Sequence, residues 1–166
     1  MTNQEYLYTA LRAMIIDANL GYDEDKILQG FRSNVDVGSG DDFVFFQELT
    51  RRITMIQPGR FEDGEITTVI NLNEVSIQVD FFGNEASNAC TVFFNYLCGF
   101  ASNFLLESFP LISIGVLNDI QNKTTEWDRG KYLPRFLTRF SLFLKQETSR
   151  EEPKFTQIVS QLKYYL

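Results

Sequence analysis

In the stretch Val75-Ser76-Ile77-Gln78-Val79-Asp80-Phe81-Phe82-Gly83, apolar and polar residues alternate along the chain. This period of two predicts a β-strand with one apolar face and one polar face. The apolar face carries Val75, Ile77, Val79 and Phe81. Gly83 ends the run, at a point where a residue free to adopt positive φ is useful. The pattern therefore predicts a half-buried strand at the centre of the core.

A long apolar helix is predicted directly after this strand, from Asn84 to about Ser108. Phe109-Pro110 ends it, because proline cannot continue a helix. Apolar residues at helical spacing form a broad stripe: Ala86, Ala89, Cys90, Phe93, Phe94, Leu97, Phe100, Ala101, Phe104 and Leu105. We expect such a helix to be covered on more than one side, by a sheet or by a neighbouring subunit.

The remaining predicted elements flank this strand and helix. Thr2 and Glu5 fit a capping box, which predicts a helix from about Thr2 to Asn19. Strands are predicted at Ile27–Arg32, Phe43–Thr50 with a prolongation to Ile56, Ile66–Phe82 with a bulge or bend at Asn71–Asn73, Leu111–Leu117 and Leu133–Lys145. The expected fold class is α+β: a single domain in which a mostly antiparallel or mixed β-sheet packs against a long central helix and an N-terminal helix.

The C-terminal part of the sequence differs from the rest. We expect the α+β domain to span residues 1–146, and residues 147–166 to form a charged linker followed by an apolar arm. The apolar residues of the arm fit a helix or a strand. Arms of this kind often need a partner surface.

Composition excludes several classes of function. A chain of 166 residues without histidine cannot by itself supply Ser-His-Asp or Cys-His catalysis, a common zinc site or a histidine acid–base step. A net charge of −7 argues against gripping nucleic acid by phosphate neutralisation. No apolar run reaches the length of a membrane span, and the N-terminus lacks the basic and apolar regions of a secretory signal. We expect no enzyme and no membrane partner.

The two cysteines, Cys90 and Cys98, fall on one predicted helix, about 12 Å apart along its axis. That separation is too large for a disulfide. We interpret both as small buried apolar side chains in a reducing compartment. The polar loop Asn34–Asp42 lacks the ligand spacing and closing Glu of a calcium loop, so no metal or cofactor is expected.

The order of these features resembles a known family. A strand ending Gln78-Val79-Asp80-Phe81-Phe82-Gly83 is followed by a helix that opens at Asn84-Glu85-Ala86. An apolar strand at Ile112–Val116, a polar stretch with Glu126-Trp127 and Arg129, and a strand from Arg135 to Leu144 come next. Over residues 4–146 the chain resembles the neck and tail terminator proteins of tailed bacteriophages and prophages. It differs from them in its long acidic loops and its aromatic C-terminal arm.

The resemblance implies a structural virion protein without a cofactor or a catalytic role. Such proteins form a ring, usually a homohexamer, that caps the tail tube and joins it to the head connector or stopper. DNA passes through the ring during ejection without specific binding. The implied partners are other copies of the chain, the tail tube protein and the connector, and the implied location is the virion, after assembly in the bacterial cytoplasm.

Two groups of residues follow as candidate sites for such a ring. Acidic loops facing the lumen would repel the DNA backbone; the candidates are Asp41, Asp42, Glu62, Asp63 and Glu65. Arginine pairs and aromatic anchors suit contacts between subunits; the candidates are Arg51, Arg52, Trp127, Arg129, Phe155, Ile158, Leu162, Tyr164 and Tyr165. There is a simpler interpretation of each group. The acidic loops are only solvated, the arginines are exposed and unpaired, and Trp127 covers the core of its own domain.

Two other functions fit parts of the sequence. A head–tail stopper or a tail tube subunit would share the same build and the same kind of partner. An enzyme acting through carboxylates would use the paired acids Asp41-Asp42 or Glu62-Asp63. Adjacent carboxylates on a loop usually diverge, however, and the chain has no Gly-rich phosphate-binding signature.

Overall fold

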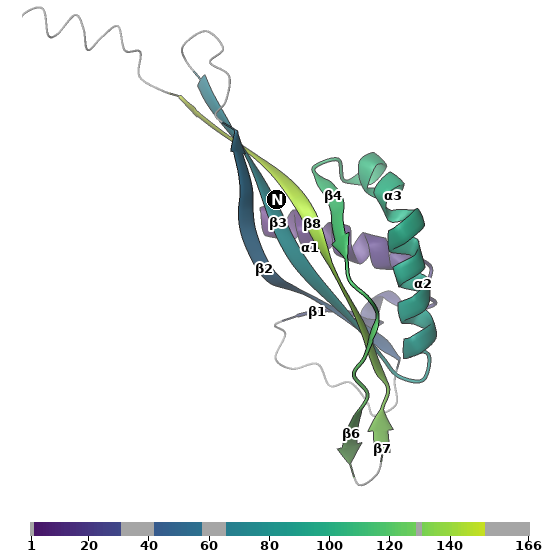
Figure 1. Ribbon diagram of the computed structural model, residues 1–166. Helices are drawn as coiled ribbons and strands as arrows, with labels where there is room; N and C mark the ends of the chain where they lie inside the picture. Colours follow the sequence, from purple (N-terminus) through teal and green to yellow (C-terminus); the bar gives the residue numbers. More distant parts are fainter. Residues whose placement is uncertain (1, 31–41, 58–65, 129–130, 152–166) are drawn as a thin grey trace, which may run out of the picture.

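The computed structural model of the chain describes residues 2–30, 42–57, 66–128 and 131–151. Helices and strands alternate irregularly along the chain (Figure 1). In order they are α1 (Asn3–Asp17), the 3-10 turn η1 (Glu24–Lys26), β1 (Ile27–Gln29), β2 (Phe43–Gln57), β3 (Ile66–Phe82), α2 (Ala86–Gly99), α3 (Ala101–Ser108), β4 (Ile112–Leu117), β5 (Gln121–Asn122), β6 (Thr125–Asp128), β7 (Lys131–Leu133) and β8 (Arg135–Glu151).

A six-stranded sheet forms one layer of the domain. Its strands follow the order β1-β2-β3-β8-β4, and β5 also pairs with β8. β1 runs parallel to β2, while the other pairs in this sheet are antiparallel. The three helices pack on one face of it (Figure 1). The predicted α+β class with a mixed sheet is therefore confirmed.

The long strand β3 lies at the centre of the sheet, as the alternation predicts. It pairs with β8 without interruption, from Ile66 opposite Glu151 to Phe82 opposite Arg135. The irregularity predicted at Asn71–Asn73 falls instead on the neighbouring strand β2, where the register shifts at Leu49 and Thr54. A bulge places two residues of one strand opposite one of its partner. At the second bulge, the Thr54 hydroxyl donates a hydrogen bond of 3.0 Å to the carbonyl of Leu72.

The predicted apolar face of β3 forms the core. Val75, Ile77, Val79 and Phe81 are completely buried. Phe93 of α2 lies against this face, with ring centroids 5.7 Å from Phe81 and 6.1 Å from Phe140 of β8. The prediction of these four core residues is confirmed.

The opposite face of β3 differs from the prediction. Asp80 is completely buried and Gln78 almost so, so the strand is buried on both faces here rather than on one. Alternation identified which residues share a face, but it carries no information about what covers the polar face. Part of the cover comes from the side chains of Arg135 and Arg139 on β8, which lies far away in the sequence.

The N-terminal helix forms as its cap predicts. The Thr2 side chain accepts a hydrogen bond from the backbone of Glu5, and the Glu5 carboxylate accepts one from the backbone of Thr2. Its apolar stripe is buried: Leu7, Ala10, Leu11, Met14 and Ile15. The ring of Tyr8 contacts Phe46 of β2, which places α1 on the same side of the sheet as α2.

The predicted long helix is two helices, and this part of the prediction is wrong. α2 and α3 meet at a bend of 65° between Gly99 and Ala101. Glycine lowers helix stability by about 1 kcal/mol relative to alanine, so Gly99 favours a break. The bend keeps Ala101 and Leu105 buried, whereas Phe100 at the bend is 69% exposed instead of sharing the buried stripe.

The C-terminal strand is longer than predicted. β8 begins at Arg135 and continues to Glu151, where it still pairs with Ile66 of β3. Residues 147–151 therefore belong to the sheet and not to a linker. The polar region before β8 contains β6 and β7, which form a small antiparallel pair of their own. The arm at Phe155–Leu166 lies outside the described residues.

Gly83 gives a testable prediction at the turn between β3 and α2. Its φ is +102°, and a Cβ there would lie 2.8 Å from the Cα of Asp42. We expect Gly83→Ala to destabilise the domain by at least about 2 kcal/mol, because backbone strain and a steric clash add. Gly21→Ala is the control, since Gly21 also has positive φ but has open space around it. Urea unfolding that gives equal losses for both variants would contradict the clash.

Candidate interaction surfaces

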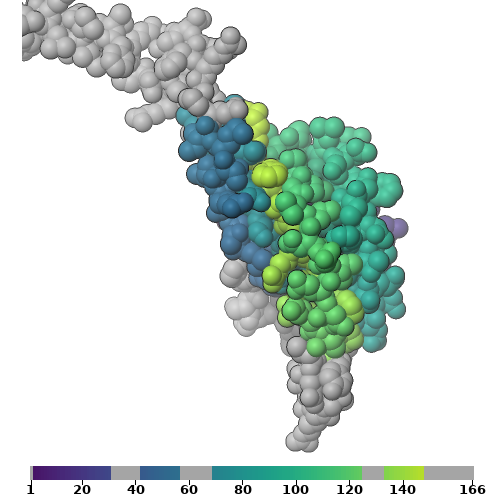
Figure 2. Space-filling model, viewed as in Figure 1, coloured from purple at the N-terminus to yellow at the C-terminus, as the bar shows by residue number. Residues whose placement is uncertain are grey.

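A narrow ribbon formed by β2, β3 and β8 projects beyond the helices (Figure 1), and β2 lies along one side of the molecule, apart from the helices (Figure 2). On β2, every residue from Leu49 to Ile56 is exposed. Ile53 is 58% exposed and Ile56 62% exposed, and Met55 on the same strand is also exposed. Exposed isoleucines on a strand are unfavourable in water, so Ile53, Met55 and Ile56 make this strand a candidate interaction surface.

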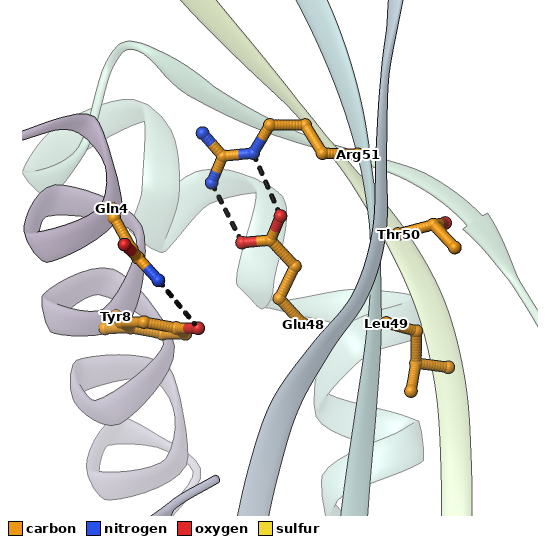
Figure 3. A pocket seen from close by; sticks show the side chains of 6 residues that line it. All are labelled: Gln4, Tyr8, Glu48, Leu49, Thr50 and Arg51. Carbon is orange, nitrogen blue, oxygen red and sulfur yellow. Dashed lines mark hydrogen bonds and ion pairs between the residues drawn. The ribbon is translucent and has the colours of Figure 1, made fainter. Parts of the chain in front are cut away.

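Both predicted arginines on this ribbon have partners within the chain. The guanidinium of Arg51 donates hydrogen bonds of 3.0 and 2.9 Å to the two carboxylate oxygens of Glu48 (Figure 3). Arg52 donates one of 2.7 Å to Glu74 on β3. These pairs hold the charges in place on the strand, and Arg52 remains largely exposed. A contact of either arginine with a neighbouring subunit stays a prediction.

A hollow of about 340 Å³ lies between α1 and this part of β2 (Figure 3). It is lined by Gln4, Tyr8, Glu48, Leu49, Thr50 and Arg51. The amide of Gln4 and the hydroxyl of Tyr8 bond to each other, and the Glu48–Arg51 pair closes the other side. Four of the lining side chains therefore bond to one another in pairs, and the hollow continues the exposed surface of the ribbon.

Asp42 is the one candidate lumen residue within the described part of the chain. Its carboxylate accepts a hydrogen bond of 3.2 Å from the backbone N–H of Glu85, just before α2. Carboxylates are favourable at a helix N-terminus because the helix dipole is positive there. Asp42 therefore stabilises the turn around Gly83 and is half-buried rather than free.

The other candidates are less well defined. The acids Asp41, Glu62, Asp63 and Glu65 lie outside the described residues, as do Arg129, Phe155, Ile158, Leu162, Tyr164 and Tyr165. Trp127 lies on β6, in the small β6–β7 pair.

A buried polar network, which sequence reasoning missed, lies on the sheet face away from the helices. Arg135 of β8 donates to Asp80 at 2.8 Å, and Gln78 donates to the other oxygen of Asp80 at 2.7 Å. Arg139 donates in turn to Gln78 at 2.8 Å. Arg135 also lies over the ring of Phe82, 5.4 Å from its centroid. Every member has a partner, as a buried network requires, and the bonds between Arg135, Arg139, Gln78 and Asp80 connect β8 to β3.

A second exposed apolar area lies at the bend between α2 and α3. Phe100 and Val92 border a hollow of about 410 Å³, whose floor includes Ala18 and Tyr96. The Tyr96 hydroxyl donates a hydrogen bond of 2.8 Å to Asp17. Burial, together with this bond, raises the pKa of Tyr96. Leu106 on α3 is also exposed.

The two cysteines occupy different environments. Cys90 is buried against the sheet, as predicted, but Cys98 is exposed, which the prediction of two buried thiols had wrong. Burial raises the pKa of the Cys90 thiol from 9.0 to about 12. A helix turns 100° per residue, so residues eight positions apart differ in direction enough for one to leave the core.

This difference gives a second prediction. We expect a thiol reagent at neutral pH to modify Cys98 and to leave Cys90 unmodified until the protein unfolds, because only thiolates that solvent reaches react. Peptide mass mapping after labelling identifies which thiol has reacted. Equal labelling of both thiols in native buffer would contradict the prediction.

The raised pKa of Cys90 also makes the stability of the fold depend on pH. The protonated thiol stabilises the folded state fully below pH 9, and this contribution is lost as the pH rises to about 12.

Among residues 2–30, 42–57, 66–128 and 131–151, no group of three or more His, Cys, Asp or Glu side chains is placed to hold a metal ion. Within the same residues, no single helix is long and apolar enough to cross a membrane. Together α2 and α3 reach that length and composition, but they are bent and pack into the core of this domain.

No protein-family model matches this chain, and no curated protein matches it. With no match to a known family, the class of this protein is described from its fold and its exposed surfaces. It is an α+β domain of two layers, one of sheet and one of helices, with exposed apolar areas on a β-ribbon and at a helix bend.

Proposed function

We propose that this chain is a structural virion protein of a bacteriophage neck, a tail terminator that forms a ring on the end of the tail tube and joins it to the head connector. The observation that carries the proposal is the ribbon, whose Ile53 and Ile56 are exposed in a single chain. Surfaces of this kind are covered by partners in an assembly. The resemblance of residues 4–146 to tail terminators supplies the kind of assembly.

Two further features support a structural role. The elements that carry the resemblance lie together, with the strand that ends at Phe82 next to β8 and both beneath α2. The charged groups of Asp80, Arg135 and Arg139 are used within the fold. The proposed partners are other copies of the chain, the tube protein and the connector.

The net charge of −7 suits a ring through which DNA passes. Like charge between a lumen and phosphates prevents adhesion during transit. This part of the proposal concerns the acids Asp41, Glu62, Asp63 and Glu65, which lie outside the described residues, since Asp42 bonds to the start of α2.

Tube growth tests the proposal. Purified tail tube protein is polymerised with increasing amounts of this chain, and tube lengths are measured by electron microscopy. A terminator shortens the tubes in proportion to its amount and appears as a ring at their ends. Unchanged tube lengths without end rings would refute the proposal. Polymerisation of this chain alone into tubes would identify a tube subunit, and binding only to the connector would identify a stopper.

A further inference from the structure

The outer edge of β2 is open over most of its length. β1 pairs with β2 only at Val44–Phe46, and the N–H of Gly30 donates to the carbonyl of Phe46. From Gln47 to Gln57, that edge has no strand partner among the described residues. Backbone donors and acceptors along such an edge are a template for another strand.

The last part of β8 has a second open edge. β4 pairs with β8 only as far as Leu144, and the N–H of Lys145 donates to the carbonyl of Leu111. Beyond that point, Gln146–Glu151 pairs with β3 on one side and with no other strand in the described part of the chain. The ribbon therefore ends in three strands with an open edge on each side (Figure 1).

The two edges complement each other in direction. β2 and β8 are both antiparallel to β3, so they run the same way along the ribbon. Two copies in the same orientation, placed side by side, bring β8 of one next to β2 of the other as a parallel pair. The contact uses two different surfaces, so repeating it generates a ring when the rotation between copies closes and an open filament when it does not.

The two edges also complement each other in charge. The open part of β2 carries Arg51 and Arg52 against one acid, Glu48. The open part of β8 carries the acids Glu147 and Glu151 and the base Arg150, and Glu147 already pairs with Lys145 at 2.6 Å, just before the open part. Opposite charges across a strand pair are favourable and like charges are not, so the excess of one base on the open part of β2 and of one acid on the open part of β8 favours pairing of β2 with β8 over pairing of either edge with itself.

We infer that the open edge of β2 binds the open edge of β8 in a second copy of this chain, so that neighbouring copies share one continuous sheet. Closure of a ring in this way would pair the open edges of β2 and β8 in the described residues and would place a strand beside Ile53 and Ile56, which are exposed in the single chain. The inference deepens the proposed ring by naming how its copies join, and it rests on that proposal for ring closure.

Two blocked variants test the inference. Ile53→Lys with Ile56→Lys blocks the β2 edge, and Glu147→Lys with Glu151→Lys makes the β8 edge repel β2. Leu106→Lys is the matched control, because Leu106 is 72% exposed but lies on α3, away from both edges. Masses are measured by sedimentation velocity, and folding is checked by circular dichroism.

Each blocked variant alone is expected to be monomeric, with self-association weakened at least about tenfold. Their mixture keeps one intact β2 edge and one intact β8 edge, so it is expected to form a dimer of twice the 19.2 kDa chain mass. The control is expected to assemble as the unmodified chain does. Hydrogen exchange on the unmodified chain is a second measurement, and assembly is expected to protect amides in Gln47–Gln57 and Gln146–Glu151.

Four results would overturn the inference: an unmodified chain that is monomeric at its highest soluble concentration, a blocked variant that assembles normally, a mixture that stays monomeric, or edge amides left unprotected in the assembly. Self-association of the β8 variant alone would indicate pairing of β2 with β2. The tube-growth experiment is read separately. If the chain caps tubes but the edge variants assemble normally, only this inference is refuted. If assembly depends on the two edges but the chain does not cap tubes, only the proposed function is refuted.

Discussion

Phe93→Ala is expected to destabilise the domain by about 4 kcal/mol. Phe93 is completely buried, and its ring contacts Phe81 on β3, Phe140 on β8 and Tyr96 on its own helix. Truncation removes the apolar contacts between α2 and two central strands and leaves a cavity that this closely packed core fills only in part. A domain of this size has a total stability of about 5–15 kcal/mol, so the variant is expected to be close to unfolding at 37 °C.

Phe100→Ala is the control for this prediction. Both residues belong to the apolar stripe predicted for one long helix, but Phe100 is 69% exposed. Its truncation is expected to cost less than about 0.5 kcal/mol, as for other exposed positions. Both variants are unfolded in urea at one fixed protein concentration, because self-association changes apparent stability. Similar losses for the two variants would mean that Phe93 is not a core contact.

Arg135→Met is expected to destabilise the domain by about 3 kcal/mol. The guanidinium of Arg135 is the charged partner of Asp80, whose side chain is only 1% exposed. Without it, the buried carboxylate keeps the amide of Gln78 but loses its counter-charge. The Arg135 side chain is about one-third exposed, so solvent screens part of the interaction. We therefore expect a loss at the lower end of the range for broken buried pairs.

Arg52→Met provides a matched comparison, since Arg52 also pairs with a carboxylate on β3 but is largely exposed. Exposed pairs contribute at most about 1 kcal/mol. Adding Asp80→Asn to Arg135→Met is expected to recover about 1 kcal/mol, because the uncompensated charge is then removed. A loss for Arg135→Met no larger than that for Arg52→Met, or no recovery in the double variant, would contradict a buried ion pair.

Local patterns predicted much of the fold. The capping box placed the start of α1 at Thr2, and alternation placed the four core residues of β3. The bounds of β3 agree with the prediction because a long run of strand-forming residues ends at Gly83, which has positive φ. These features depend on neighbours a few residues apart, and such neighbours are visible in a sequence.

Predictions failed where a distant segment decides the outcome. The continuation of β8 to Glu151 depends on pairing with Ile66, which lies far away in the sequence. Without knowledge of the partner strand, a charged run such as Glu147–Glu151 predicts a linker. Of the candidate sites, Arg51 and Arg52 fell on the exposed ribbon, but the chain itself supplies their partners.

The sequence by itself determined the α+β class, the core face of β3 and the lack of histidine chemistry, because periodicity and composition are properties of the chain alone. Only the tertiary structure decided that Asp80 and Gln78 are buried in a network with Arg135 and Arg139. It also decided that β2 and β8 keep open edges on one ribbon. Burial of a polar face and exposure of an edge depend on which strands meet, and strands more than fifty residues apart meet only once the chain has folded.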